Sequence, residues 1–213
     1  MQFPDARILI FAKAPVAGKV KTRLIPALGA QQAAAFHAAC VRRCTLDRVA
    51  MGIAPVALFV DGPLDHPVIE QLRASVEIDV YPQQGDDLGE RMLNAAQHVL
   101  SSASLVLLTG TDSPGLTRDD FICAMMALRQ GHEVVMQPAF DGGYVMLGLQ
   151  ARFPNLFTDM PWGTDRVAQL TAERCQKFGA SLYQLEPSWD VDRPEDLSRL
   201  QGLVGFETWA SGG

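Results

Sequence analysis

Short runs of consecutive apolar residues alternate along the chain with longer stretches in which apolar residues recur every three or four positions. The runs have the length of buried strands, and the longer stretches have the periodicity of amphipathic helices. The predicted strands cover residues 7–12, 55–60, 76–81, 105–109, 133–137, 144–149 and 181–186. The predicted helices cover residues 30–51, 66–74, 117–130 and 164–178, with further helices beginning at residues 87 and 194. Continuously apolar strands separated by helices are typical of a mostly parallel sheet with helices on both faces, so the pattern predicts an α/β/α sandwich.

Acidic residues mark the start of two of these helices. Asp87 is followed three positions later by Glu90, and Asp192 is followed at the same spacing by Glu195. This spacing is typical of a capping box, in which each side chain bonds a free backbone N–H of the first turn. The sequence therefore predicts a capping box at Asp87 and another at Asp192.

The most unusual polar segment follows the first predicted strand. Lys13, Lys19, Lys21 and Arg23 lie within eleven positions of a loop that also contains Gly18. Parallel sheets bind ligands beyond the carboxyl ends of their strands, and clustered basic side chains with backbone N–H groups suit a polyphosphate. The alternative is a basic loop that is only solvated. The spacing is not that of a Walker A loop, because no Ser or Thr follows the Gly-Lys pair.

Acidic residues follow two later strands. Asp112 comes directly after the most apolar strand, where its carboxylate could hold Mg²⁺ or could cap the turn before Pro114. Asp190 and Asp192 lie two apart in an extended stretch, so either of them could join Asp112 in a metal site. If Asp112 is a metal ligand, Asp112→Asn should abolish metal-assisted nucleotide binding and leave the melting temperature nearly unchanged.

Two adjacent glycines form the third feature at this edge of the predicted sheet. Gly142 and Gly143 permit a positive φ or the close approach of a ligand to the backbone, although a plain turn would also account for them.

Composition narrows the class of protein. The 213 residues are 48% hydrophobic and 20% charged, which is ordinary for a globular protein, and the length fits a single domain over residues 1–213. Lys and Arg number 18 against 24 Asp and Glu, so there is no bulk positive field to attract nucleic acid. The absence of a basic, apolar leader and of a continuous run of about 18 apolar residues predicts a cytoplasmic protein without membrane contact.

Five segments together resemble the nucleotide-diphospho-sugar transferase superfamily, which has the GT-A-like fold. They are FAKAPVAGKVKTRL (11–24), GDDLGERM (85–92), TGTDSPGL (109–116), PAFDGGYVMLGL (138–149) and DVDRPEDL (190–197). The order of the segments resembles most closely a branch of small bacterial transferases, often labelled glycosyltransferases, associated with radical-SAM and selenium-related genes. The chain is also similar to guanylyl- and cytidylyltransferases, including the molybdenum cofactor and phospholactate types.

The resemblance implies a role for particular residues of this chain. The implied nucleotide-binding residues are Ala12, Lys13, Gly18, Lys21, Arg23 and Asp112. The implied catalytic residues among them are Lys13, Arg23 and Asp112, and Mg²⁺ or Mn²⁺ would be held by Asp112 and Asp192. Gly142 and Gly143 would bind substrate. Residues 1–137 would form the nucleotide-binding half of the domain, and residues 138–213 the acceptor and metal half. One departure is Arg193, which stands where relatives usually have Thr.

The resemblance implies one of two transfer reactions, and a third hypothesis comes from another class of protein. In nucleotidyl transfer, a phosphorylated small-molecule acceptor attacks the α-phosphate of a nucleoside triphosphate and pyrophosphate leaves. In glycosyl transfer, a nucleoside diphosphate leaves from an NDP-sugar donor. A module that binds nucleotide without turnover is the third. Four cations in one loop suit the charge of a triphosphate, which favours nucleotidyl transfer.

Overall fold

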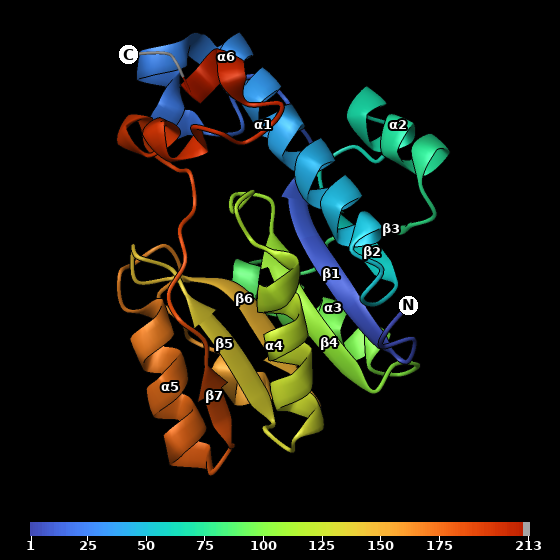
Figure 1. Ribbon diagram of the computed structural model, residues 1–213. Coiled ribbons are helices and arrows are strands. Elements are labelled where there is room, and N and C mark those ends of the chain that lie inside the picture. Colours follow the sequence, from blue (N-terminus) through green and yellow to red (C-terminus); the bar gives the residue numbers. More distant parts are fainter. Residues whose placement is uncertain (211–213) are drawn as a thin grey trace.

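The computed structural model describes residues 1–210 and contains one seven-stranded sheet between layers of helices (Figure 1). The strands run in the order β3-β2-β1-β4-β6-β5-β7. Only β6 is antiparallel to its neighbours β4 and β5, and the other pairs are parallel. The strands are β1 (Ala6–Lys13), β2 (Val56–Asp61), β3 (Asp79–Pro82), β4 (Leu105–Gly110), β5 (Val134–Pro138), β6 (Tyr144–Leu149) and β7 (Leu182–Gln184). The predicted mostly parallel α/β/α architecture is confirmed.

Helices connect the strands and cover both faces of the sheet. The α-helices are α1 (Ile25–Ala50), α2 (Pro67–Ser75), α3 (Leu88–Val99), α4 (Arg118–Arg129), α5 (Val167–Phe178) and α6 (Glu207–Ala210). Short 3₁₀ helices are η1 (Thr22–Leu24), η2 (Pro154–Leu156) and η3 (Pro194–Leu200). Side chains alternate between the faces of each strand, so Ile8 and Ile10 pack with α1, α2 and α4, whereas Leu9 packs with α3 and α5.

Helix α1 is longer than the sequence predicts. It begins five residues before the predicted start and is kinked at Gly29, where φ is 77°. Residues 22–50 are long and apolar enough by composition to cross a membrane, in contrast to the expectation from the sequence. In this structure 44% of the 18-residue window that meets this criterion is buried within the protein, and α1 contributes residues to two of its apolar clusters.

The two predicted capping boxes have different outcomes. Asp87 caps α3 by accepting from the Glu90 N–H at 2.8 Å, but the Glu90 carboxylate reaches the N–H of Asp86 instead of that of Asp87. The capping box predicted at Asp192 was wrong, because the N-cap residue of η3 is Arg193, one position later. The chain stays extended through Asp192, η3 begins at Pro194, and the Asp196 carboxylate accepts from the N–H groups of Asp192 and Arg193. Proline favours the first position of a helix, which accounts for the later start.

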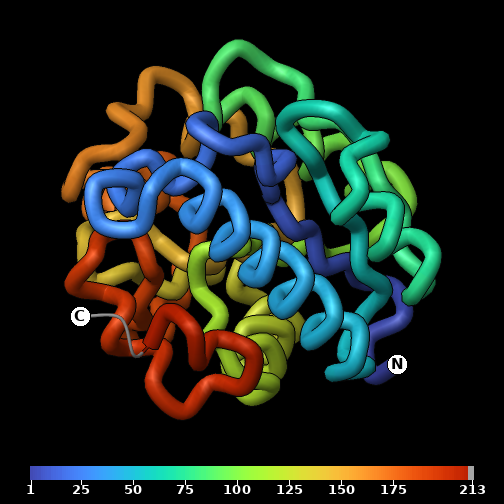
Figure 2. Tube along the Cα trace, turned by 90° about the horizontal axis from the view of Figure 1, so that it is seen from above, coloured from blue at the N-terminus to red at the C-terminus, as the bar shows by residue number. Residues whose placement is uncertain are grey.

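The C-terminal segment packs on the first half of α1 (Figure 2). Leu197, Leu200 and Phe206 share an apolar cluster with Leu24 and Phe36. Val191, at the start of this segment, is fully buried and lies between two acidic residues, Asp190 and Asp192. This packing brings both acids to the carboxyl edge of the sheet.

Candidate functional site

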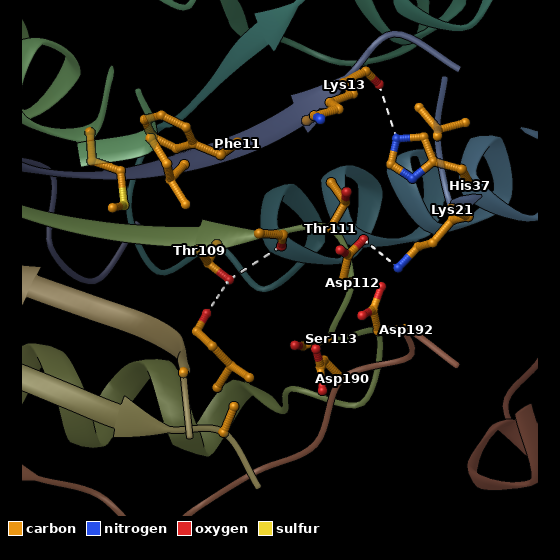
Figure 3. A pocket seen from close by; sticks show the side chains of 18 of the residues that line it. Phe11, Lys13, Lys21, His37, Thr109, Thr111, Asp112, Ser113, Asp190 and Asp192 are labelled. Atoms are coloured by element: carbon orange, nitrogen blue, oxygen red, sulfur yellow. Dashed lines mark hydrogen bonds and ion pairs between the residues drawn. The ribbon is translucent and has the colours of Figure 1, made fainter. Parts of the chain in front are cut away.

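A cavity of about 750 Å³ opens beyond the carboxyl ends of β1 and β4 (Figure 3). The chain runs from β1 to β2 on one side of the sheet and places β4 on the other, so the cavity lies where the strand order reverses. Open α/β sheets bind ligands at such a point. The cavity wall includes residues from all five segments singled out in the sequence.

The basic loop after β1 forms one wall of the cavity. Ala12, Lys13, Lys19, Lys21 and Arg23 line it. Gly18 does not line the cavity; it turns the loop with a φ of 80°. Lys13 and Lys19 are exposed and form no ion pair within residues 1–210, so their ammonium groups are free to bind an anion.

Lys21 is already paired. Its Nζ lies 2.8 Å from Oδ1 of Asp112 and also donates to the carbonyl oxygen of Val191. The Lys21 side chain is 3% exposed, whereas that of Asp112 is 47% exposed through the mouth of the cavity. Burial alone would lower the pKa of Lys21 and raise that of Asp112, but their attraction outweighs burial and shifts both in the opposite directions. The pair is therefore ionised, and Lys21 is the counter-ion of Asp112.

Asp192 is paired with Arg23, which belongs to the basic loop. Its carboxylate accepts from the Arg23 guanidinium, and both side chains are partly exposed. The sequence assigns Arg23 to phosphate and Asp192 to metal. The structure brings the two residues together, and in the ligand-free protein each neutralises the other.

Asp190 lines the cavity and forms no ion pair with a cation within residues 1–210. Burial, and then the carboxylates of Asp141 and Asp112, raise the pKa of Asp190 to about 6. Figure 3 shows Asp112 and Asp192 near the Lys21 ammonium, and Asp190 farther from it, beside Ser113. No group of three or more His, Cys, Asp or Glu side chains within residues 1–210 lies close enough together to hold a metal ion without further ligands. The mutual repulsion of these acids and their oxygen-only donor set nevertheless fit a hard divalent cation whose other ligands would come from substrate.

The two predicted substrate-binding glycines behave differently. Gly143 lines the cavity, and its N–H donates to the Asp141 carboxylate at 2.9 Å. Gly142 does not line the cavity: its φ is 91°, and a side chain there would collide with the backbone of Asp165. The close backbone approach at Gly142 is thus made by the protein itself and not by a ligand.

Several lining residues were not assigned from the sequence. His37 in α1 is buried, and its Nε2 lies 3.0 Å from the carbonyl oxygen of Lys13. Burial lowers the pKa of His37, so the ring is neutral, donates through Nε2 and thereby fixes the start of the basic loop. Its position inside an Ala-rich helix gave no sign of this, because nothing local in the sequence connects it with residue 13.

The opposite end of the cavity is more apolar. Phe11, Met92, Leu108 and Tyr144 line it, and Arg91 is held by Asp61 at 2.9 Å. Arg91 and Met92 belong to the segment 85–92, which contributes to the family resemblance, but the sequence analysis assigned no role to either residue. The cavity wall therefore combines the charged side chains of the basic loop and the acids with an apolar part, a mixture that is common in small-molecule sites.

Comparisons with known proteins agree with this geometry. Residues 45–164 match the family described as "Uncharacterized protein conserved in bacteria (DUF2064)". The whole chain is similar to a protein from Desulfovibrio desulfuricans G20 that is described as a candidate nucleotide-diphospho-sugar transferase. The two share 31% identity over 98% of this chain and 94% of that one, with a TM-score of 0.85. No curated protein matches the chain.

More distant structures share the fold. One is a CMP:2-keto-3-deoxy-manno-octonic acid synthetase complexed with CTP, with 13% identity over 93% of this chain and 98% of that one and a TM-score of 0.60. Another is the 4-diphosphocytidyl-2C-methyl-D-erythritol synthase of Anaerococcus prevotii DSM 20548, with 13% identity over 91% and 92% of the two chains and a TM-score of 0.57. The fold is therefore that of nucleotidyltransferases and nucleotide-diphospho-sugar transferases.

Proposed function

This chain belongs to the bacterial family DUF2064, and on that basis and the geometry of its cavity we propose that it is a metal-dependent nucleotidyltransferase. Its donor would be a nucleoside triphosphate, and its acceptor a small molecule that the sequence leads us to expect to be phosphorylated. The observation that carries the proposal is that the basic loop and three carboxylates surround one cavity at the reversal point of the sheet.

The free cations of the loop suit the leaving group. Lys13 and Lys19 would bind the β- and γ-phosphates, because their ammonium groups are exposed and unpaired within residues 1–210. In the reaction an acceptor oxygen bonds to the α-phosphorus, the bond from that phosphorus to the bridging oxygen of the β-phosphate breaks, and pyrophosphate leaves. The two lysines stabilise the charge that develops on pyrophosphate.

The carboxylates suit a divalent cation. Asp112 and Asp192 would hold Mg²⁺ or Mn²⁺, which when bound neutralises phosphate charge and orients the triphosphate. Lys21 keeps Asp112 ionised and points its carboxylate into the cavity. Arg23 would exchange Asp192 for a phosphate oxygen when Asp192 serves the metal, since both side chains are partly exposed and free to move apart.

Glycosyl transfer from an NDP-sugar is the second candidate. The observation in its favour is the likeness to the Desulfovibrio protein described as a candidate nucleotide-diphospho-sugar transferase. The same loop and carboxylates would then bind the diphosphate of the donor, and a nucleoside diphosphate would leave.

The test is a phosphorus NMR assay with Mg²⁺ or Mn²⁺ and two donor panels: ATP, CTP, GTP and UTP, and the common UDP- and GDP-sugars. Each donor is combined with sugar phosphates and other small phosphorylated acceptors. We expect pyrophosphate to appear in step with product from at least one triphosphate. Lys13→Ala should weaken triphosphate binding about tenfold, whereas Lys177→Ala, outside the cavity, should not. Nucleoside diphosphate released only from an NDP-sugar would establish glycosyl transfer instead. Binding of nucleotide without any turnover would indicate a non-catalytic module.

A further inference from the structure

Helix α1 carries a completely buried arginine behind the wall of the cavity. Arg48 is 0% exposed, and its guanidinium lies 5.3 Å from the centre of the Phe121 ring. Its Nη2 donates to the carbonyl oxygen of Ser113 at 3.1 Å. Its Nε and Nη1 have no hydrogen-bond partner within residues 1–210, and no carboxylate in that range forms an ion pair with it.

Such an environment is costly for a charge. Buried guanidinium groups are usually paired with a carboxylate, and even a buried ion pair can often be replaced by apolar side chains of similar volume without loss of stability. One hydrogen bond to a neutral carbonyl and one ring contact do not offset the loss of water around a full charge. Stability of the core therefore does not account for Arg48.

What Arg48 does hold is the turn that carries Asp112. The carbonyl oxygens of three consecutive residues are each bound by a distant segment of the chain. That of Thr111 accepts from the Cys44 thiol at 3.4 Å, that of Asp112 from the Val191 N–H at 2.8 Å, and that of Ser113 from Arg48. Helix α1 thus holds the carbonyls on both sides of Asp112, and the C-terminal segment holds the one between them.

We propose that Arg48 is a positioning residue that orients Asp112. By fixing the Ser113 carbonyl against α1, it keeps the turn in the conformation that directs the Asp112 carboxylate to the cavity and to Lys21. The inference rests on the proposed function only because the effect of Arg48 on ligand binding is measured as metal-dependent nucleotide binding at Asp112.

The first experiment replaces Arg48 with an apolar side chain of similar length. In Arg48→Met we expect a melting temperature close to that of the wild type, because removal of the buried charge offsets a weaker Asp112–Lys21 pair. The probe is whichever of ATP, CTP, GTP and UTP the wild type binds most tightly with Mg²⁺, and its Kd should rise about tenfold, or about 1.4 kcal/mol. The control, Arg129→Met, removes an arginine that pairs with Asp5 ahead of β1, and it should leave this Kd unchanged. An unchanged Kd in Arg48→Met would overturn the proposal.

A double-mutant cycle with Asp112→Asn separates positioning from general structural support. If Arg48 acts through Asp112, Arg48→Met should change the residual nucleotide affinity of Asp112→Asn by less than twofold. The same tenfold loss in both backgrounds would show that Arg48 supports the fold and not Asp112. If Arg48→Met does not fold, Arg48→Lys, which is too short to reach Ser113 in the same way, replaces it in the cycle with the same expected results.

Hydrogen exchange of the ligand-free protein distinguishes failure of this inference from failure of the proposed function. Loss of the Ser113 contact should speed amide exchange in peptides that cover residues 109–116, with no change in β1 or α3. If the wild type binds no triphosphate, the proposed function fails while faster exchange in this turn still supports the positioning role. Unchanged exchange there in a folded Arg48 variant would overturn the positioning role, whatever the nucleotide result.

Discussion

Asp112→Asn tests the coupling between the acid of the cavity and its buried counter-ion. The substitution keeps the shape of the side chain and removes its charge. Within residues 1–210, Lys21, with 3% of its side chain exposed, would then keep the Val191 carbonyl, an amide oxygen and the Phe36 ring as partners and would have no ion pair. The earlier expectation that the melting temperature stays nearly constant therefore no longer holds, because it treated Asp112 as a ligand without a structural partner.

The magnitude follows from the burial of the two partners. Removing one member of a fully buried pair costs about 3–5 kcal/mol, because the other charge is left without compensation. Asp112 is 47% exposed, so solvent screens part of the interaction and reduces the expected cost to about 1–3 kcal/mol. For a chain of this length, each kcal/mol shifts the melting temperature by about 2–4 °C, so a fall of roughly 4–8 °C is the central expectation.

Calorimetry at pH 7.5 without metal measures this effect independently of any ligand. The attraction of Lys21 lowers the pKa of Asp112 in the folded protein, so the stabilisation by the pair is present above the ordinary carboxyl pKa and is lost as the pH falls below about 4. The difference between wild type and variant should therefore shrink in acid. A variant that melts within 1 °C of the wild type at pH 7.5 would refute the assignment of Asp112 as the counter-ion of Lys21.

Three further substitutions test other parts of the site. Burial and the repulsion of nearby carboxylates raise the pKa of Asp190 to about 6, so ionisation of Asp190 destabilises the fold as the pH rises from about 4 to 6. Asp190→Asn should remove this pH dependence and raise the melting temperature at pH 7.5. Gly142→Ala should cost about 2–3 kcal/mol in urea unfolding and Gly179→Ala, in open space, about 1 kcal/mol; equal costs would contradict the Gly142 contact. Arg23→Lys should weaken triphosphate binding in a calorimetric titration, because lysine lacks the bidentate fork, whereas Lys177→Ala, outside the cavity, should not; equal losses would indicate non-specific attraction.

The sequence predicts the strands best where burial is continuous. The run 144–149 coincides with β6, and 105–109 matches β4 to within one residue, because an apolar run of that length has few other ways to be buried. The elements η1, η2 and α6 were not predicted, since three or four residues carry no periodicity. The early start of α1 was missed because Gly29 reads as a helix breaker, whereas packing against the C-terminal segment sustains the helix through the kink.

In the site, too, the sequence predicts what depends on neighbouring residues and misses the contacts between residues that are far apart in the chain. Lys13, Asp112 and Asp192 do line one cavity, as the position of their segments after strands predicts. The pairing of Lys21 with Asp112 could not be read from the sequence, because it depends on how β1 and β4 lie side by side. Arg48 gave no signal for the same reason: its contact with Ser113 joins residues 65 positions apart.

The contacts between the basic loop and the C-terminal segment affect how the site forms during protein synthesis. Lys21 and the carbonyl that it binds are 170 positions apart, and Arg23 and Asp192 are 169 positions apart. At typical translation rates of about 5–20 residues per second, the loop leaves the ribosome roughly 10–30 s before these partners are made. During that interval the lysine that is later buried stays in water, and the cavity lacks a wall. The site is therefore completed only when the segment that contains Val191 and Asp192 packs against the basic loop. This happens well after β1 and α1 are available to fold.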